Sequence, residues 1–197
     1  RGLADEPQAA LAQDRAQLKA YLDSLSKVTA AEFNGWSKPQ RMAFLINAYN
    51  AFTVEKILTR YPDIRSIWDF GKVFGNPFKD EFFTLLGRKQ SLDGIEHGTL
   101  RRKGAYDEPR VHFAVNCASI GCPALLNEAF TADRLDAQLD EGMLRFMSDR
   151  TRNRVRDGRL EVSLIFKWFE DDFTRGRGGY AKVEDVFARY ADQLSDD

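Results

Sequence analysis

The segment of residues 40–60 constrains the fold most, because its first half is apolar on nearly every side of a helix. Pro39 lies where the first turn of a helix accepts a proline, and Tyr61-Pro62 ends the pattern. A helix that is apolar all round must be covered by other elements on all sides. We therefore predict a central, buried helix around which the rest of the chain packs.

Three polar side chains interrupt this apolar helix. Asn47, Asn50 and Thr53 recur at every third position, so they lie along one stripe of the helix surface. A buried amide that lacks a hydrogen bond costs about 1–3 kcal/mol. Two interpretations stay open: the side chains hold the backbone of neighbouring loops, or they line a ligand pocket.

Further patterns predict helices, two hairpins and one isolated strand. Amphipathic or capped helices are expected at residues 5–25, 94–103, 131–147 and 183–194. Strand–turn–strand signals occur at residues 82–92 and at residues 153–164, the second around Asp157-Gly158. Residues 63–79 are expected to form a connection with one short helix, and residues 111–115, rich in β-branched and aromatic side chains, a buried strand.

The order of these elements is typical of the α+β class, because strands and helices do not alternate regularly. We expect a single compact domain over residues 1–197, with helices packed on a small, mainly antiparallel sheet built from the hairpins. A papain-like arrangement is one variant of this class. Within the domain, residues 1–36 are expected to form an N-terminal helical arm packed on a core of residues 37–197.

Composition excludes some classes of partner. The 29 Lys and Arg residues nearly balance the 30 Asp and Glu residues, so we expect no nucleic-acid partner. No run of eighteen or more apolar residues occurs, so no integral membrane segment is expected. The chain opens at Arg1 rather than at a methionine, which indicates a processed or trimmed product.

The chemistry is expected in residues 111–126, VHFAVNCASIGCPALL, which hold one of the two histidines and both cysteines. Asn116 ends the predicted strand, Cys117 follows it, and Pro123 after Cys122 suits the first turn of a helix. The start of a helix has free N–H groups and a partial positive charge, which stabilise a thiolate and could receive an oxyanion. This arrangement would suit a nucleophile.

Three interpretations of the cysteines and histidines stay open. In the first, Cys117 and Cys122 form a disulfide, which requires a tight turn through residues 119–121 and contributes about 2 kcal/mol or less. In the second, Cys117 is a nucleophile with a histidine as its base. In the third, both cysteines hold zinc together with His97 and His112, although the spacing matches no known zinc finger.

The catalytic interpretation leaves the base open. A regular strand would turn His112 and Cys117 to opposite faces, whereas His97 comes from another segment and escapes that objection. The candidate catalytic residues are Cys117, His97, His112, Glu96 and Asn116. The candidate substrate-binding residues are Asn47, Asn50, Ser119 and Cys122, of which Cys122 is also an alternative nucleophile.

Four blocks of sequence resemble the domain-of-unknown-function 547 family. They are FLINAYNAFT from Phe44, SLDGIEH from Ser91, VHFAVNCASIGCP from Val111 and LIFKWFEDDF from Leu164. The resemblance implies a domain found in exported bacterial proteins and attached to leucine-zipper regions in plants, and it assigns no reaction. Family motif positions fall on Asn47, Asn50, Glu96, His97, His112, Asn116, Cys117, Cys122 and Pro123, while Ala124 stands where many members have a second proline.

The most specific functional hypothesis is a periplasmic or secreted, papain-like thiol hydrolase or acyl transferase, acting without a cofactor or metal on a small amide, thioester or peptide. The alternative is a non-catalytic binding or scaffold domain with a Cys117–Cys122 disulfide. In that case the aromatic segments 68–78 and 165–173 would form the recognition surface for an unknown small-molecule or peptide ligand.

Overall fold

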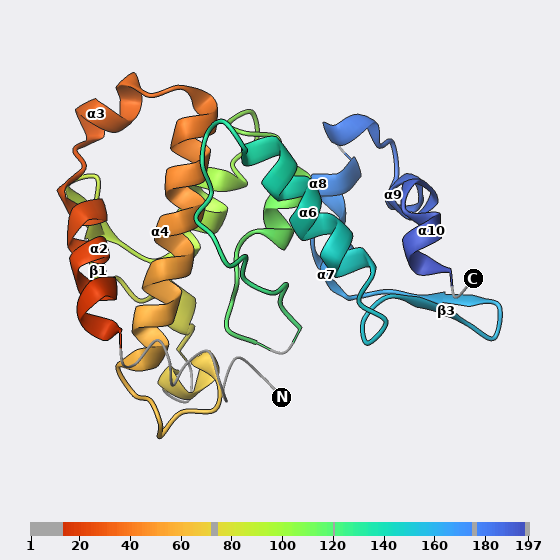
Figure 1. Ribbon diagram of the computed structural model, residues 1–197, viewed down its shortest axis with the longest axis horizontal. Coiled ribbons are helices and arrows are strands. Elements are labelled where there is room, and N and C mark those ends of the chain that lie inside the picture. Colours follow the sequence, from red (N-terminus) through yellow and green to blue (C-terminus); the bar gives the residue numbers. More distant parts are fainter. Residues whose placement is uncertain (1–13, 72–74, 120, 175–176, 196–197) are drawn as a thin grey trace.

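The computed structural model describes residues 14–71, 75–119, 121–174 and 177–195 (Figure 1). The predicted central helix is present as α4 (Lys38–Leu58), with Pro39 in its first turn. The Ser37 hydroxyl accepts a hydrogen bond from the Gln40 N–H, and the Gln40 side chain accepts one from the Ser37 N–H, so each satisfies a donor that the helix start leaves free. Ile46, Ala48 and Tyr49 are fully buried, which confirms a helix enclosed by the rest of the chain.

Two helices precede α4 in the part of the chain that the structure describes. The helix α2 (Arg15–Lys27) is the described part of the helix expected at residues 5–25, and the part before residue 14 lies outside the described residues. It buries Leu22 and Leu25, and it packs against α4 and the strand β1. The helix α3 (Ala30–Gly35) follows behind a capping box formed by Thr29 and Glu32.

Both predicted hairpins are present as antiparallel pairs. The first joins β1 (Phe83–Leu85) to β2 (Arg88–Gln90), and the second joins β3 (Arg154–Arg156) to β4 (Arg159–Glu161). Asp157 and Gly158 both have positive φ, as the tight turn of the second hairpin requires. In the described part of the chain the pairs are two separate sheets, so the expectation of one sheet beneath the helices is wrong, while the α+β class is confirmed.

The remaining helices are short and lie mostly in the C-terminal half. Two 3₁₀ helices, η1 (Ile67–Phe70) and η2 (Pro77–Lys79), lie in the connection expected at residues 63–79. The helix expected at residues 94–103 is α5 (Leu92–Ile95), capped by Ser91 and continued by the π-helix η3 (Glu96–Leu100). The later helices are α6 (Leu135–Met147), α7 (Ile165–Trp168), α8 (Glu170–Thr174), η5 (Arg177–Gly179), α9 (Val183–Arg189) and α10 (Ala191–Leu194).

Residues 111–115 are not a strand. Residues 111–113 belong to the 3₁₀ helix η4 (Pro109–Phe113), and residue 114 follows it directly. The first turn of η4 is capped by the Glu108 carboxylate, which accepts a hydrogen bond from the Arg110 N–H. The Arg110 guanidinium also binds Asp136 and Asp140, which fixes η4 against α6. Every side chain of residues 111–115 is buried, so the apolar run reflects burial on all sides rather than a pleated strand.

The buried side chains form two clusters, and η4 belongs to both. The first surrounds α4 and includes Val111 and Ala114, and the second includes Phe113 with side chains of α6 to α10. In Figure 1 the first cluster lies on the side of α2 and α4, and the second on the side of α9 and α10. The residues expected to carry chemistry therefore lie where the two clusters meet.

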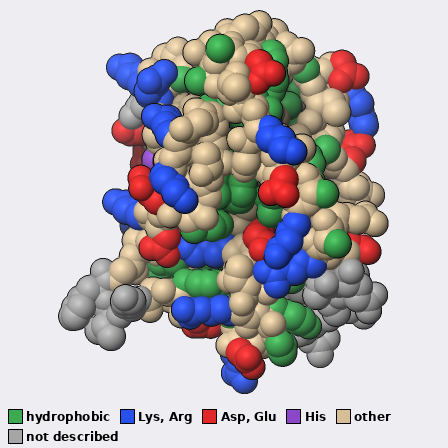
Figure 2. Space-filling view, turned by 90° about the vertical axis from the view of Figure 1, so that its left-hand side faces the viewer, with side chains coloured by type: hydrophobic (Ala, Val, Ile, Leu, Met, Phe, Trp, Pro, Cys, Tyr) green, Lys and Arg blue, Asp and Glu red, His purple; other side chains and the backbone are tan. Residues whose placement is uncertain are grey.

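The surface mixes both signs of charge. On the face shown in Figure 2, Lys and Arg side chains alternate with Asp and Glu side chains, in line with the balanced composition. No helix of the described residues is long and apolar enough to span a membrane.

Candidate functional site

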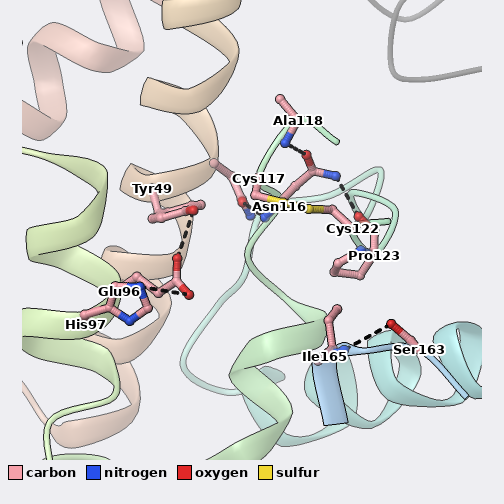
Figure 3. The surroundings of a disulfide bond; sticks show 11 residues. Tyr49, Glu96, His97, Asn116, Cys117, Ala118, Cys122, Pro123, Ser163 and Ile165 are labelled. Carbon is pink, nitrogen blue, oxygen red and sulfur yellow. Dashed lines mark hydrogen bonds and ion pairs between the residues drawn. A yellow bond between two sulfur atoms is a disulfide. The ribbon is translucent and has the colours of Figure 1, made fainter. Parts of the chain in front are cut away.

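The loop that follows η4 is closed by a disulfide between Cys117 and Cys122, whose Cα atoms lie 5.9 Å apart (Figure 3). Neither cysteine is a free thiol. The Asn116 side chain accepts a hydrogen bond from the Ala118 N–H (2.7 Å) and donates one to the Pro123 carbonyl (2.6 Å). One buried amide therefore ties the two ends of this segment together, and residues 116–123 are called the disulfide loop below.

The helix expected to start at Pro123 does not form, because residues 121–130 contain no helix. The thiolate stabilisation predicted from a helix that starts at Pro123 is therefore absent. The conformation of the segment is instead fixed by the disulfide and by the asparagine amides that bond to its backbone.

Two asparagines of α4 hold backbone on either side of the disulfide loop. Asn50 accepts from the Asn116 N–H and donates to the Ala114 carbonyl, each at 2.9 Å. Asn47 makes the same pair of bonds to the N–H and carbonyl of Phe130, at 2.9 and 2.8 Å. Both amides are half-buried, and the Thr53 hydroxyl bonds back to its own helix at Tyr49. This geometry is the one that the backbone-holding interpretation requires.

His112 is buried in η4 and bound to a carboxylate from far along the chain. Its Nε2 lies 2.9 Å from Oδ2 of Asp172 in α8, and its ring stacks on Phe169 with centroids 4.1 Å apart. Burial lowers the pKa of His112 and outweighs the opposite effect of the hydrogen bond to Asp172. His112 is therefore neutral at neutral pH and donates its Nε2–H to the carboxylate.

Asp172 links His112 to Arg101, the residue directly after the π-helix. The same Oδ2 accepts from Arg101 Nε at 2.6 Å. Burial alone would raise the pKa of Asp172, but the hydrogen bonds from His112 and Arg101 hold that pKa well below its usual range. Asp172 is therefore ionised, and its charge is compensated by the guanidinium.

His97 and Glu96 lie in the π-helix η3, where the Arg101 N–H reaches back five residues to the Glu96 carbonyl (2.9 Å). His97 Nδ1 is hydrogen-bonded to Arg101 Nη1, and its Nε2 lies 3.9 Å from Asp93 Oδ1 and 4.0 Å from Glu96 Oε1. The Tyr49 hydroxyl donates to Glu96 Oε2 (3.0 Å; Figure 3). Single π turns are frequent at functional sites, so this departure from an α-helix supports a role for the surface beside it.

That surface contains an open cavity of about 370 Å³. It is lined by His97, Arg101, Lys167, Trp168, Phe169, Glu170, Asp171 and Asp172. Its walls bring the π-helix together with α7 and α8, and Trp168 leaves 66% of its surface exposed. The cavity therefore combines charged hydrogen-bonding groups of both signs with an exposed aromatic ring.

The family model described as "Protein of unknown function, DUF547" matches residues 33–147, more than half of the chain. The protein belongs to the DUF547 family. No significant match was found among curated proteins or solved structures.

The DUF547 match covers only part of the candidate site. It contains α4, the disulfide loop, Glu96, His97 and Arg101, and it ends at Met147. The block LIFKWFEDDF, which supplies Trp168, Phe169 and Asp172, lies beyond it. The cavity of this DUF547 protein is thus formed between the matched region and the segment that follows it.

The predicted site residues fall into two groups in space. Glu96 and His97 lie at or beside the cavity, and His112 reaches it through Asp172 and Arg101. The second group forms or holds the disulfide loop and consists of Asn50, Asn116, Cys117, Ser119 and Cys122. Asn47 belongs to neither group, because it holds the backbone of Phe130. A catalytic Cys–His pair needs a hydrogen bond between a histidine and a free cysteine thiol. Here the two sulfurs are bonded to each other, so neither cysteine has a free thiol.

A zinc site is not assembled from these side chains. Within residues 14–71, 75–119, 121–174 and 177–195, no group of three or more His, Cys, Asp or Glu side chains is placed to hold a metal. The disulfide occupies both sulfurs that zinc would bind as thiolates.

The sequence did not single out Arg101, and it offered Trp168 and Asp172 only as members of the aromatic segment 165–173, the recognition surface of the alternative function. Arg101 and Asp172 are 71 positions apart, so no local pattern indicates their ion pair. The acidic and aromatic composition of residues 165–173 was the available signal, since a charged residue next to several phenylalanines has to be paired if it is buried.

Proposed function

We propose that this DUF547 protein is an exported ligand-binding domain whose site is the cavity between the π-helix and α7–α8, and whose disulfide loop is structural. The observation that carries the proposal is the exposed Trp168 ring at the edge of a cavity of about 370 Å³ with polar walls. Leaving a large apolar side chain exposed forgoes roughly 1.5–3 kcal/mol of burial, which a bound ligand can recover.

The state of the cysteines supports binding over thiol chemistry. A nucleophilic cysteine must be a thiolate, and both sulfurs of this chain are consumed in one disulfide. The two histidine nitrogens with hydrogen bonds face Asp172 and Arg101. The papain-like thiol hydrolase or acyl transferase stays a prediction that would apply to reduced protein.

The same disulfide supports export. Disulfides persist in oxidising compartments such as the periplasm and the extracellular space, whereas thiols are kept reduced in the cytosol. We infer a periplasmic or secreted location from this bond.

The test is to map binding on the three tryptophans of the ¹⁵N-labelled oxidised protein by the NMR signals of their indole N–H groups. The probes are small polar compounds in four classes: neutral sugars, amino acids, organic acids with phosphates, and polyamines. At least one class is expected to shift the Trp168 signal in a saturable manner, while the signal of Trp68, which is also exposed, stays unchanged. If no class shifts the Trp168 signal, or if all three indoles shift together, the cavity is not the binding site.

A further inference from the structure

We propose that the cavity binds a neutral saccharide, with a sugar ring stacked on Trp168 and its hydroxyls bonded to the charged walls. This inference rests on the proposed function and names the class of ligand. The structure supports it through the geometry of the aromatic ring, the balance of charge in the walls and the rigidity of the site.

The exposed ring is the first element. Trp168 ends α7, and its largely exposed indole ring is part of the lining of a polar cavity. A sugar ring has an apolar face of C–H groups and a polar rim of hydroxyls. It can therefore cover an indole face while its hydroxyls remain hydrogen-bonded, a combination that an aromatic ring with one wet edge favours.

The charges of the walls decide between classes of ligand. Arg101 and Asp172 form an ion pair with each other, and the lining also contains the cation of Lys167 and the carboxylate of Glu170. A polyphosphate would meet the Glu170 carboxylate, and a polyamine would meet the Lys167 ammonium, so each would face like charge. A neutral polyol meets no such repulsion.

Hydroxyl groups also match the polar atoms that line the cavity. Each hydroxyl donates one hydrogen bond and accepts others. It can accept from the ammonium of Lys167 and donate to the carboxylate of Glu170, so one type of ligand group serves walls of both signs.

The walls are fixed before any ligand arrives. Phe169 lies between the ring of His112, at 4.1 Å, and the Arg101 guanidinium, 4.2 Å from its centroid. Asp172 bonds both of these residues, and Arg101 bonds His97 at the other side of the cavity. A preformed site of this kind pays little for ordering when it binds.

The size of the cavity fits a short saccharide. Its volume of about 370 Å³ is at the lower end of the range of ligand pockets, roughly 300–1,000 Å³. It is also open to solvent, so a longer glycan could continue beyond it.

The experiment uses the oxidised chain and three neutral trisaccharides of different linkage: chitotriose, cellotriose and maltotriose. Tripolyphosphate and spermidine serve as the charged probes. Affinities are measured by ligand-observed NMR, so that the readout does not depend on Trp168 itself. The matched variants are Trp168→Ala and Trp68→Ala, because both residues are exposed tryptophans and only the first lines the cavity.

At least one trisaccharide is expected to bind, with an affinity reduced about tenfold or more in Trp168→Ala and unchanged in Trp68→Ala. Equal affinity of the wild type and Trp168→Ala would overturn the inference, as would a failure of all three sugars. Binding of tripolyphosphate or spermidine alone, with a shift of the Trp168 signal, overturns the saccharide class while the cavity remains the binding site. If no probe of any class shifts that signal, both the saccharide and the binding proposal fail.

Discussion

The disulfide loop and the segment α7–α8 both combine polar and apolar side chains, but they use them in opposite ways. In the loop, the Asn116 amide is bonded to backbone, both sulfurs are bonded to each other, and Asn50 holds the loop from α4. In α7–α8 one side faces the interior of the protein, where Phe166, Asp172 and Phe173 are buried. The other side presents Lys167, Trp168 and Glu170 to the cavity.

This difference predicts which side chains contribute to stability and which contribute to binding. Groups whose hydrogen bonds are made inside the protein are not free for a ligand, so we expect the Asn116 amide and the two bonded sulfurs to serve stability rather than binding. The outward side of α7–α8 carries the exposed polar groups of Lys167 and Glu170, and a ligand can replace the water around them. Substitutions in the first set should change the free energy of unfolding, and substitutions in the second should change affinity.

The largest expected effect comes from Asp172→Ala. Removing one partner of a buried ion pair leaves the other charge uncompensated and typically costs about 3–5 kcal/mol. Asp172 is almost fully buried and serves both Arg101 and His112, so we expect a loss in that range by chemical denaturation. Glu170→Ala, two positions earlier on the exposed side, should change stability by less than about 0.5 kcal/mol. Equal losses in the two variants would remove the distinction between the sides of α7–α8.

A smaller loss is expected for Asn50→Ala. The change leaves the Asn116 N–H and the Ala114 carbonyl without their partner, at a cost of about 1–3 kcal/mol. Asn34→Ala, an exposed asparagine in α3, is the matched control and should be close to neutral. A denaturation midpoint of Asn50→Ala equal to that of the wild type would show that the loop does not depend on the amide.

The smallest expected effect is a dependence on pH that comes from His112. Because the folded-state pKa of His112 is lowered from 6.5, the unfolded chain binds a proton first as the pH falls. The contribution of His112 to the free energy of unfolding is therefore fully present above pH 6.5. It declines below that pH, by at most about 1.4 kcal/mol per pH unit. Asp172, whose pKa is also lowered, adds its own loss only in more acidic solution, below about pH 4.

The variant His112→Gln should reduce this decline between about pH 6.5 and 5. His97→Gln keeps His112 intact and should retain it. Stability curves of the wild type and His112→Gln that fall in parallel over this interval would show that His112 is not the titrating group.

Features that depend on local pattern were predictable from sequence. The apolar run of residues 40–60 marked α4, and the spacing of Asn47 and Asn50 marked a polar stripe on it, because helical periodicity is visible in one segment. The second hairpin followed from Asp157-Gly158, whose positive φ angles are those of its turn.

Features that depend on contacts between distant parts of the chain were not predictable from sequence. The strand expected at residues 111–115 is the 3₁₀ helix η4, because its apolar residues pack against both core clusters and Arg110 is fixed by carboxylates of α6. The same limit applies to the site. Glu96 and His97 could be named from their types, whereas the bond between Arg101 and Asp172 requires the fold.

The most direct test of a structural rather than catalytic disulfide is the reactivity of Cys117 and Cys122 in protein purified from an oxidising export compartment. We predict that iodoacetamide labels neither residue until a reductant is added, and that the intact mass is lower than that of the reduced protein by the hydrogens of one disulfide. The contrary result is fast labelling of a single cysteine at about pH 6 that disappears in His97→Ala or His112→Ala. That outcome would identify a histidine-activated thiol and restore the hydrolase hypothesis in place of the binding domain.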